Sequence, residues 1–323
     1  YFPAISFDPN NSGKFVIAYK DSGNLNYGTA IVGTITGTTI AFGSEYVFNA
    51  GHANASTISF DPINSDKFVI TYTDGSNSNY GTAIVGTVTG TTIAFGSEYV
   101  FNGNVAVWQP AISFDPNNSG KFVIAYTDAT ASNNVGTAIV GTITGTTIAF
   151  GSKYVFNNAA TTGCLLSFDP NNSDKLVIAY RDQGNSSYGT AIVGTVTGTT
   201  IAFGSKYVFN NANSLTGTGH GGVLSFDPNN SGKFGIAYKD IGNSGYGTAI
   251  IGTVSGTTIT YGSKYVFNSA TTEFMRLHFD PINTGKFIIV YQGYAQKGKV
   301  VVGTISPAVT NLTADNFLGI SDD

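Results

Sequence analysis

Residues 6–49 read SFDPNNSGKFVIAYKDSGNLNYGTAIVGTITGTTIAFGSEYVFN, and the rest of the chain repeats this stretch. The opening tetrapeptide returns, once with histidine in place of serine, at Ser59, Ser113, Ser167, Ser225 and His278. Neighbouring starts are 53 to 58 residues apart, so the chain holds six copies. A period of this size indicates a repeat architecture in which each copy builds one supersecondary unit.

One copy contains four strand-like runs separated by turn residues. In the first copy they are residues 4–7, 14–19, 29–36 and 39–48. The second run, KFVIAY, is apolar on both of its faces, which is typical of a strand buried on both sides. Gly43 and Ser44 predict a bulge or bend in the fourth run. β-Branched and aromatic residues dominate and no helical period persists, so every run is expected to be a strand.

These features predict an all-β fold, a six-bladed β-propeller of four-stranded antiparallel blades. Its domain spans residues 1–305, with copies starting near residues 4, 57, 111, 165, 223 and 276. An open β-solenoid fits less well, because its repeats are shorter and form one rung each. The sixth copy lacks the TTIAFGSKYVF run, so the last blade lacks a recognisable outer strand of its own. Residues 306–323 are expected either to supply that strand or to link to a further domain, and we favour a fragment of a longer protein.

Composition narrows the possible partners. Net charge is −4 with only 15 lysines and arginines, and no basic stripe appears, so nucleic-acid binding is disfavoured. The chain contains no run of 18 apolar residues, so membrane insertion is not predicted. The single cysteine, Cys164, excludes an internal disulfide framework. Charged residues make up only 11% of the chain, so threonine, asparagine, serine and backbone are expected to cover most of the surface.

The copy-wide motifs FDPNNSGKFVIAY, YGTAIVGT and TTIAFGS, with the tail TNLTADNFLGISDD, carry a resemblance. The chain resembles repeat-rich virion or tail-associated proteins of marine bacteriophages over its whole length. That resemblance implies a phage-borne module on the virion surface, facing the extracellular medium, and supplies no catalytic residues. Val135 departs from the pattern by replacing the tyrosine of YGT in the third copy.

The connections between copies differ most, and rare side chains gather in them. The position five residues before the serine or histidine that begins each repeated tetrapeptide is occupied, in chain order, by Tyr1, Asn54, Trp108, Thr162, His220 and Glu273. Around a closed ring these positions converge toward one axis. We therefore predict a ligand-binding face made of Trp108, Gln109, His220, Glu273, Arg276 and Tyr1. Trp108 is the leading candidate because aromatic faces stack on sugar rings, and the alternative is that it plugs the mouth of a central channel.

The acidic residues mostly fall at repeated positions and have structural explanations. The aspartate of FDP and the second repeated aspartate, Asp21 in the first copy, are expected to cap turns rather than to bind metal. The alternating position Glu45, Glu98, Lys153, Lys206 and Lys264 is expected to protect an exposed strand edge or to contact a neighbouring subunit. A sialidase active site is not predicted, because the chain contains only two arginines and such a site needs more. No catalytic residues, metal ligands or cofactors are predicted.

These observations favour a non-enzymatic recognition or adhesion module that binds a host-surface glycan or protein. The alternatives are a structural spacer of a phage tail or appendage, and a polysaccharide hydrolase that would use Glu273. The expected partners are a cell-surface receptor or other virion subunits, without nucleic acid, and a homo-oligomer is possible.

Overall fold

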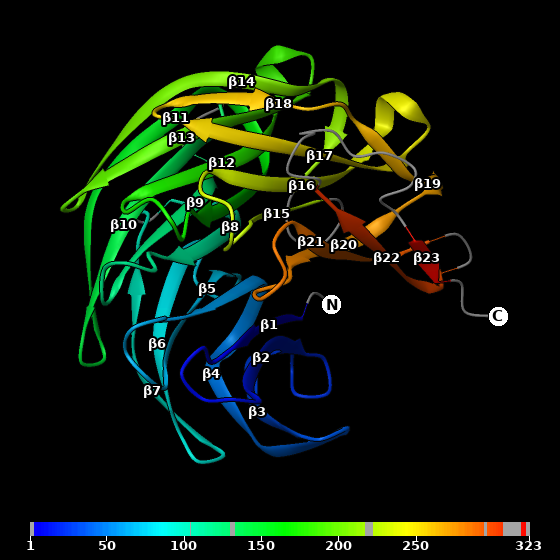
Figure 1. Ribbon diagram of the computed structural model, residues 1–323. Helices are drawn as coiled ribbons and strands as arrows, with labels where there is room; N and C mark the ends of the chain where they lie inside the picture. The colour runs from blue at the N-terminus through cyan, green and yellow to red at the C-terminus, as the bar shows by residue number, and fades with distance from the viewer. Residues whose placement is uncertain are drawn as a thin grey trace. The chain divides into compact units, whose positions relative to one another are not determined.

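Antiparallel strands make up the chain throughout the residues that this computed structural model describes (Figure 1), which are 3–103, 105–129, 133–216, 222–293, 296–305 and 318–320. The helical turns in these ranges are η1 (Gln183–Asn185) and η2 (Ile241–Asn243). No described helix has the length and apolar character needed to cross a membrane. The strands form two compact units, residues 1–158 with 197–201, and residues 159–196 with 202–323.

The first unit holds the first three copies. Its strands are β1 (Ala4–Phe7), β2 (Lys14–Asp21), β3 (Tyr27–Thr36), β4 (Thr39–Phe60), β5 (Lys67–Asp74), β6 (Tyr80–Thr89), β7 (Thr92–Val100), β8 (Val107–Phe114), β9 (Lys121–Asp128), β10 (Val135–Thr144) and the start of β11 (Thr147–Phe168). Within each copy the strands pair antiparallel in chain order, as the sequence predicts.

The second unit holds the last three copies. Its strands are the end of β11, β12 (Lys175–Asp182), β13 (Tyr188–Thr197), β14 (Thr200–Leu215), β15 (Gly222–Phe226), β16 (Lys233–Asp240), β17 (Tyr246–Ser255), β18 (Thr258–Tyr261), β19 (Tyr265–Thr271), β20 (Glu273–Phe279), β21 (Lys286–Gln292), β22 (Gly298–Thr304) and β23 (Leu318–Ile320). The last copy has no strand of the TTIAFGSKYVF type. The short strand β23 instead pairs with β22 as its outermost strand, and residues 306–317 lie outside the described ranges.

Two connections that read as loops in the sequence are continuous strand. The segment NAGHANAST, residues 49–57, lies inside the 22-residue strand β4. The early part of β4 is the fourth strand of the first copy, paired with β3, and its late part is the first strand of the second copy, paired with β5. One strand thus leads from one sheet into the next, and β11 does the same further along the chain.

The apolar core lies between neighbouring sheets. In the first unit, one cluster joins Val16 and Val32 of the first copy to Phe68 and Tyr72 of the second. Strands β5 and β9 are buried on both faces along nearly their whole length, which confirms the expectation for the second run. Strand β21 of the last copy differs, because its buried residues alternate with exposed ones.

The two glycines of YGTAIVGT make room for aromatic rings. A Cβ added at Gly86 would lie 2.1 Å from Cζ of Phe68, its cross-strand partner. A Cβ at Gly81 would lie 2.5 Å from the ring of Phe101. The same two close contacts between glycine and aromatic ring recur in other copies. The motif YGTAIVGT is therefore explained by ring packing rather than by a ligand site.

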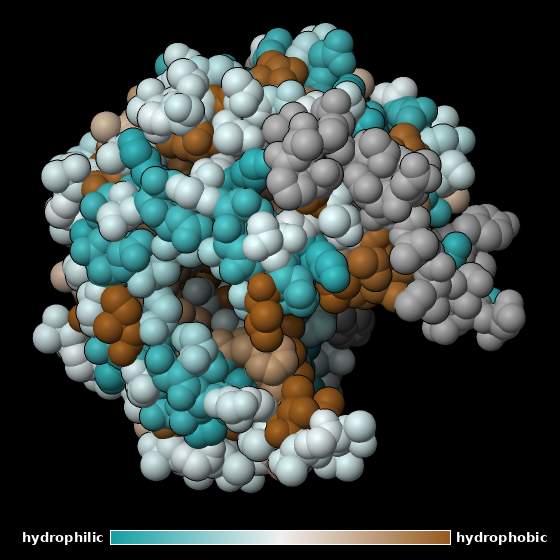
Figure 2. All heavy atoms as spheres, viewed as in Figure 1, coloured by the Kyte–Doolittle hydropathy of each residue, from teal (hydrophilic) through white to brown (hydrophobic). Residues whose placement is uncertain are grey.

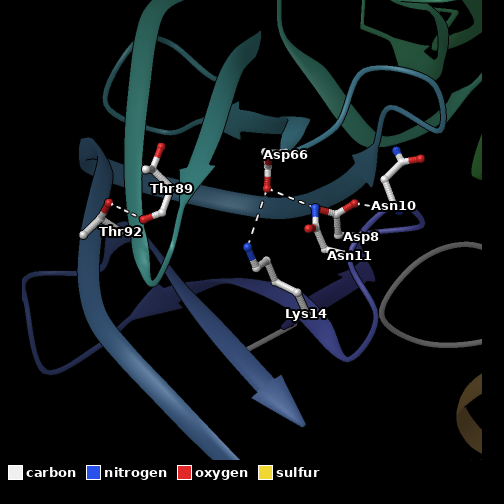
Figure 3. A network of polar contacts seen from close by, with 7 residues as sticks. All are labelled: Asp8, Asn10, Asn11, Lys14, Asp66, Thr89 and Thr92. Atoms are coloured by element: carbon white, nitrogen blue, oxygen red, sulfur yellow. Dashed lines mark hydrogen bonds and ion pairs between the residues drawn. The ribbon is translucent and has the colours of Figure 1, made fainter.

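The turn after each first strand is held by its aspartate. Figure 3 shows the first of these turns, in which Asp8 accepts hydrogen bonds from the amide of Asn10 (2.9 Å) and from Nδ2 of Asn11 (2.7 Å). Asn11 also donates to Asp66 of the second copy (3.1 Å), and Lys14 lies 3.6 Å from the same carboxylate. The turn therefore fixes its own backbone and also joins two copies.

In later copies the aspartate itself reaches across to its neighbour. Oδ2 of Asp61 accepts from the amide of Gly120 (3.0 Å), and Oδ2 of Asp227 accepts from the amide of Gly285 (3.1 Å). Both aspartates are fully buried. The interpretation of these residues as turn caps is confirmed, with an added contact between copies that the sequence did not reveal.

The face drawn in Figure 2 is mostly pale or teal, with brown in separate patches. Exposed apolar side chains include Ile5 and Phe7 on β1, and Ile288 and Val290 on β21.

Candidate functional site

In the four copies where the structure describes it, the predicted ligand position falls at a β-bulge in the first strand. Pairing with the second strand shifts register directly after Asn54, Trp108, Thr162 and Glu273. The next residue has a left-handed backbone in all four cases, at Ala55 (φ 49°), Gln109 (φ 50°), Gly163 (φ 67°) and Phe274 (φ 52°). A bulge redirects the side chains around it, and a left-handed backbone costs a residue other than glycine about 1–2 kcal/mol. Strain retained at a shared position marks it as a candidate site.

Trp108 is the most available side chain at these bulges. It lies on β8 opposite Thr127 and is 47% exposed. Within the described residues it makes no hydrogen bond and no ring contact, so its indole face and its N–H can both meet a ligand. Gln109 follows it in the strained conformation and is half-buried.

The equivalent bulge of the last copy carries charge and a second aromatic ring. Glu273 is paired with the ammonium group of Lys239, which comes from the second strand of the preceding copy. Phe274, the strained residue, is 41% exposed. Sequence reasoning missed Phe274, although its alignment with Gln109 was the available signal.

Arg276 contacts other residues than Glu273. It pairs with Val290, and its guanidinium donates to the carbonyl of Met275 (2.8 Å). Burial lowers the pKa of Arg276, and burial together with the nearby Arg276 charge lowers the pKa of His278. No hydrogen bond or ion pair joins Arg276 to Glu273 in the described part of the chain.

Neighbouring copies are joined at the bulges by one repeated contact. The seventh residue of a second strand reaches the bulge of the following copy. Lys20 donates to Oδ1 of Asn54 (3.2 Å), Thr73 donates to the carbonyl of Val107 (2.9 Å), and Lys239 pairs with Glu273. The bulge residues are thus held from a second sheet, which limits their freedom before any ligand arrives.

The remaining predicted positions are divided between parts of the chain. Tyr1 and His220 lie outside the described residues. Trp108 and Gln109 belong to the first unit, whereas Glu273 and Arg276 belong to the second. Their convergence on one pocket stays a prediction.

The second repeated acid caps the loop that follows it in the first two copies, as predicted, whereas the turns after Asp182 and Asp240 have no side-chain cap bond. Oδ1 of Asp21 accepts from the amide of Gly23 (2.8 Å), and Oδ1 of Asp74 accepts from the amide of Ser76 (3.0 Å). In the third and fourth copies a lysine on the fourth strand meets this acid, at Lys153 and Asp128 (3.4 Å) and at Lys206 and Asp182 (3.7 Å).

The glutamates at the alternating position are engaged with the sheet rather than standing free at an edge. Glu45 accepts a hydrogen bond from the hydroxyl of Tyr19, and Glu98 accepts one from Tyr72, both at 2.5 Å. Burial raises the pKa of Tyr72 well above its usual range, and the bond to Glu98 raises it further, so the hydroxyl stays protonated and donates. These two glutamates therefore anchor the fourth strand of their copy to the second, and edge protection stays a prediction.

Other candidate groups have structural roles. Cys164 is fully buried. The backbone amide of His52 donates to Oγ of Ser76 (2.8 Å). Among the described residues no three histidine, cysteine or acidic side chains are grouped as metal ligands.

No family model and no curated protein sequence matches the chain. Its fold is similar to that of several solved structures. A putative 6-phosphogluconolactonase from Bacteroides fragilis superposes with a TM-score of 0.67 at 9% identity, over 98% of this chain and 84% of that one. The BP39L lectin from Burkholderia pseudomallei gives 0.66 at 9% identity, over 100% and 86%. Sqt1 from Chaetomium thermophilum, bound to the N-terminus of ribosomal protein L10, gives 0.59 at 12%, over 96% and 73%.

At this level of identity the likeness establishes architecture alone. Six copies of a four-stranded antiparallel sheet, with cores between neighbouring sheets, agree with it. The fold of this chain is a β-propeller.

Proposed function

We propose that this chain is a non-enzymatic recognition module that binds carbohydrate through its bulge residues. The observation that carries the proposal is Trp108, a half-exposed ring without hydrogen bonds or ring contacts, next to a strained backbone at Gln109. Sugar rings present apolar C–H faces that pack on such a ring, and hydroxyls that the indole N–H can meet. The similar fold of a lectin supports this use of the architecture.

The origin suggested by the repeat motifs belongs to the same proposal. The module would sit on the surface of a phage particle, in the extracellular medium, and its ligand would be a glycan of the host surface. Exposed charge is scarce, so binding would depend on stacking and hydrogen bonds and would respond weakly to salt.

A glycan array probed with the purified chain tests the proposal, followed by affinity measurement for the best glycan. Trp108→Ala should weaken binding at least tenfold, because truncating a buried aromatic anchor costs about 2 kcal/mol or more. Trp108→Phe, which keeps an aromatic face, should lose less. An array without hits, or an unchanged affinity in Trp108→Ala, would refute it.

A peptide ligand is the second candidate, because Sqt1, of similar fold, is bound to the N-terminus of a ribosomal protein. A hydrolase is less well supported: Glu273, the acid proposed for it, is already paired with Lys239. Loss of polysaccharide turnover in Glu273→Gln would revive that alternative. A structural spacer would be favoured if other virion subunits covered Trp108 in an intact particle.

A further inference from the structure

A cavity of about 340 Å³ lies in the second unit, where the fourth copy meets the fifth. Asn210 and Ala212 of β14 form one wall, and Val266 of β19 forms another. Asp240, Asn243, Thr248 and Lys264 of the fifth copy supply the rest of the polar lining. The volume falls at the lower end of the range of about 300–1,000 Å³ that is typical of small-molecule sites, so it suits a single ring-sized ligand.

Two polar atoms of this lining are buried without a partner. Oδ1 of Asp240 and Oγ1 of Thr248 make no hydrogen bond with any residue that the structure describes, although the two residues are only 6% and 1% exposed. The equivalent oxygens of Asp21 and Asp74 cap their loops, but the η2 turn after Asp240 has no side-chain cap bond. A buried acceptor without a donor is costly, and a ligand hydroxyl would satisfy it.

Lys264 supplies the opposite charge without closing the cavity. Its ammonium group donates to Oδ1 of Asn210 (2.6 Å) and, at longer range, to Oδ1 of Asn211 (3.5 Å). No ion pair joins it to Asp240 in the described part of the chain. In the preceding copy the equivalent Lys206 lies 3.7 Å from Asp182. In the fifth copy the carboxylate and the ammonium group therefore line the same cavity without forming an ion pair between described residues.

This arrangement has the chemistry of a site for neighbouring hydroxyl groups. One hydroxyl can donate to the carboxylate of Asp240 while the next accepts from Lys264, and Thr248 can do either. Ala212 and Val266 offer an apolar surface to ring C–H groups. An amine ligand would satisfy Asp240 but would be repelled by Lys264, whereas an uncharged polyol suits both.

We propose that this cavity is a second carbohydrate subsite, which takes one monosaccharide unit through Asp240, Thr248 and Lys264. The inference rests on the proposed glycan-binding function but uses residues separate from the bulges. It predicts that the chain binds a simple sugar independently of Trp108.

Titration calorimetry and ligand-observed NMR with the methyl glycosides of galactose, mannose, glucose, fucose and N-acetylglucosamine test the subsite. Asp240→Asn and Thr248→Val should each weaken binding of the preferred glycoside about tenfold or more, since hydrogen bonds to a charged group are strong. Asp182→Asn is the matched control, because it makes the same change at the equivalent aspartate of the preceding copy. That variant and Trp108→Ala should bind the glycoside as the wild type does, and melting curves establish that all four variants fold.

The subsite is overturned if no methyl glycoside binds the wild type at millimolar concentration, or if Asp240→Asn and Thr248→Val bind normally. Binding of methylammonium in place of every glycoside would also overturn it, by assigning the cavity to a cation. In each of these cases, a glycan-array signal that still depends on Trp108 would leave the proposed function standing. Loss of array binding with retained glycoside binding would instead refute the role of the bulge residues alone.

Discussion

Asp227 offers the sharpest test of how the copies are held together. Its carboxylate accepts from the amide of Asn229 (2.9 Å), from Nδ2 of Asn230 (2.6 Å) and from the amide of Gly285 in the next copy (3.1 Å). Asp280, at the same place one copy later, makes the equivalent bonds within its own turn and is far more exposed. We predict that Asp227→Ala destabilises the protein much more than Asp280→Ala.

The size of the effect follows from the bonds lost. The buried amide of Gly285 left without an acceptor costs about 1–3 kcal/mol, and each of the two bonds within the turn contributes about 1 kcal/mol. We therefore expect Asp227→Ala to lower the free energy of unfolding by about 3–5 kcal/mol, a large part of the 5–15 kcal/mol typical of a folded protein. Asp227→Asn should lose only part of this, because its amide oxygen can replace Oδ2 and accept two of the three bonds, while its amide nitrogen would face the donor amide of Asn229.

Urea unfolding followed by far-UV circular dichroism measures the change, with Asp280→Ala as the matched control. Hydrogen exchange of the Gly285 amide gives a local measurement that does not assume two-state unfolding. That amide should lose protection in Asp227→Ala and keep it in Asp280→Ala. Equal destabilisation by the two variants, with unchanged exchange at Gly285, would show that the contact between copies contributes little.

Two further predictions concern local packing and acid. Gly86→Ala should lower the free energy of unfolding by about 1–3 kcal/mol in thermal or urea unfolding, because the new Cβ would meet the ring of Phe68. Gly298→Ala, with open space around the glycine, should change it by less than about 0.5 kcal/mol. Equal effects of the two substitutions would contradict the packing argument. The pKa of Asp280 is held below its ordinary value of 3.8, first by the backbone amide of Asn283, so its carboxyl should titrate below 3.8 by NMR. Because the pKa of Asp280 is lower in the folded than in the unfolded protein, its carboxylate contributes stability above the unfolded pKa, and this stability is lost as pH falls through the folded pKa. A titration midpoint of Asp280 at or above 3.8 would contradict the prediction.

The repeat, the strands and the turns could be predicted from the sequence because their causes are local. The alternation of KFVIAY reports two buried faces, and the cluster of aspartate, proline, asparagine and glycine reports a capped turn. Even so, the sequence of the segment NAGHANAST indicates a loop and the segment is strand, because β4 continues without a break from its pairing with β3 to its pairing with β5.

The candidate site was predictable only as a position. Alignment of the copies singled out Trp108 and Glu273, and the structure places both directly before a bulge. It did not indicate that Glu273 pairs with Lys239, or that Phe274 is the strained, exposed residue beside it. Both facts depend on which sheet lies next to the bulge. The sequence of a single copy does not indicate which residues of the adjoining copy lie beside it.

The sequence alone determined the number of copies, the four strands in each and the residues that turn the chain between them, since these follow from contacts a few residues apart. Only the tertiary structure decided which oxygens are satisfied. Asp227 accepts its last hydrogen bond from Gly285, 58 residues away, while Oδ1 of Asp240 has no donor among the described residues. Near-identical copies can differ in this way because the hydrogen bonds of a buried carboxylate depend on where the adjoining copy places its own groups.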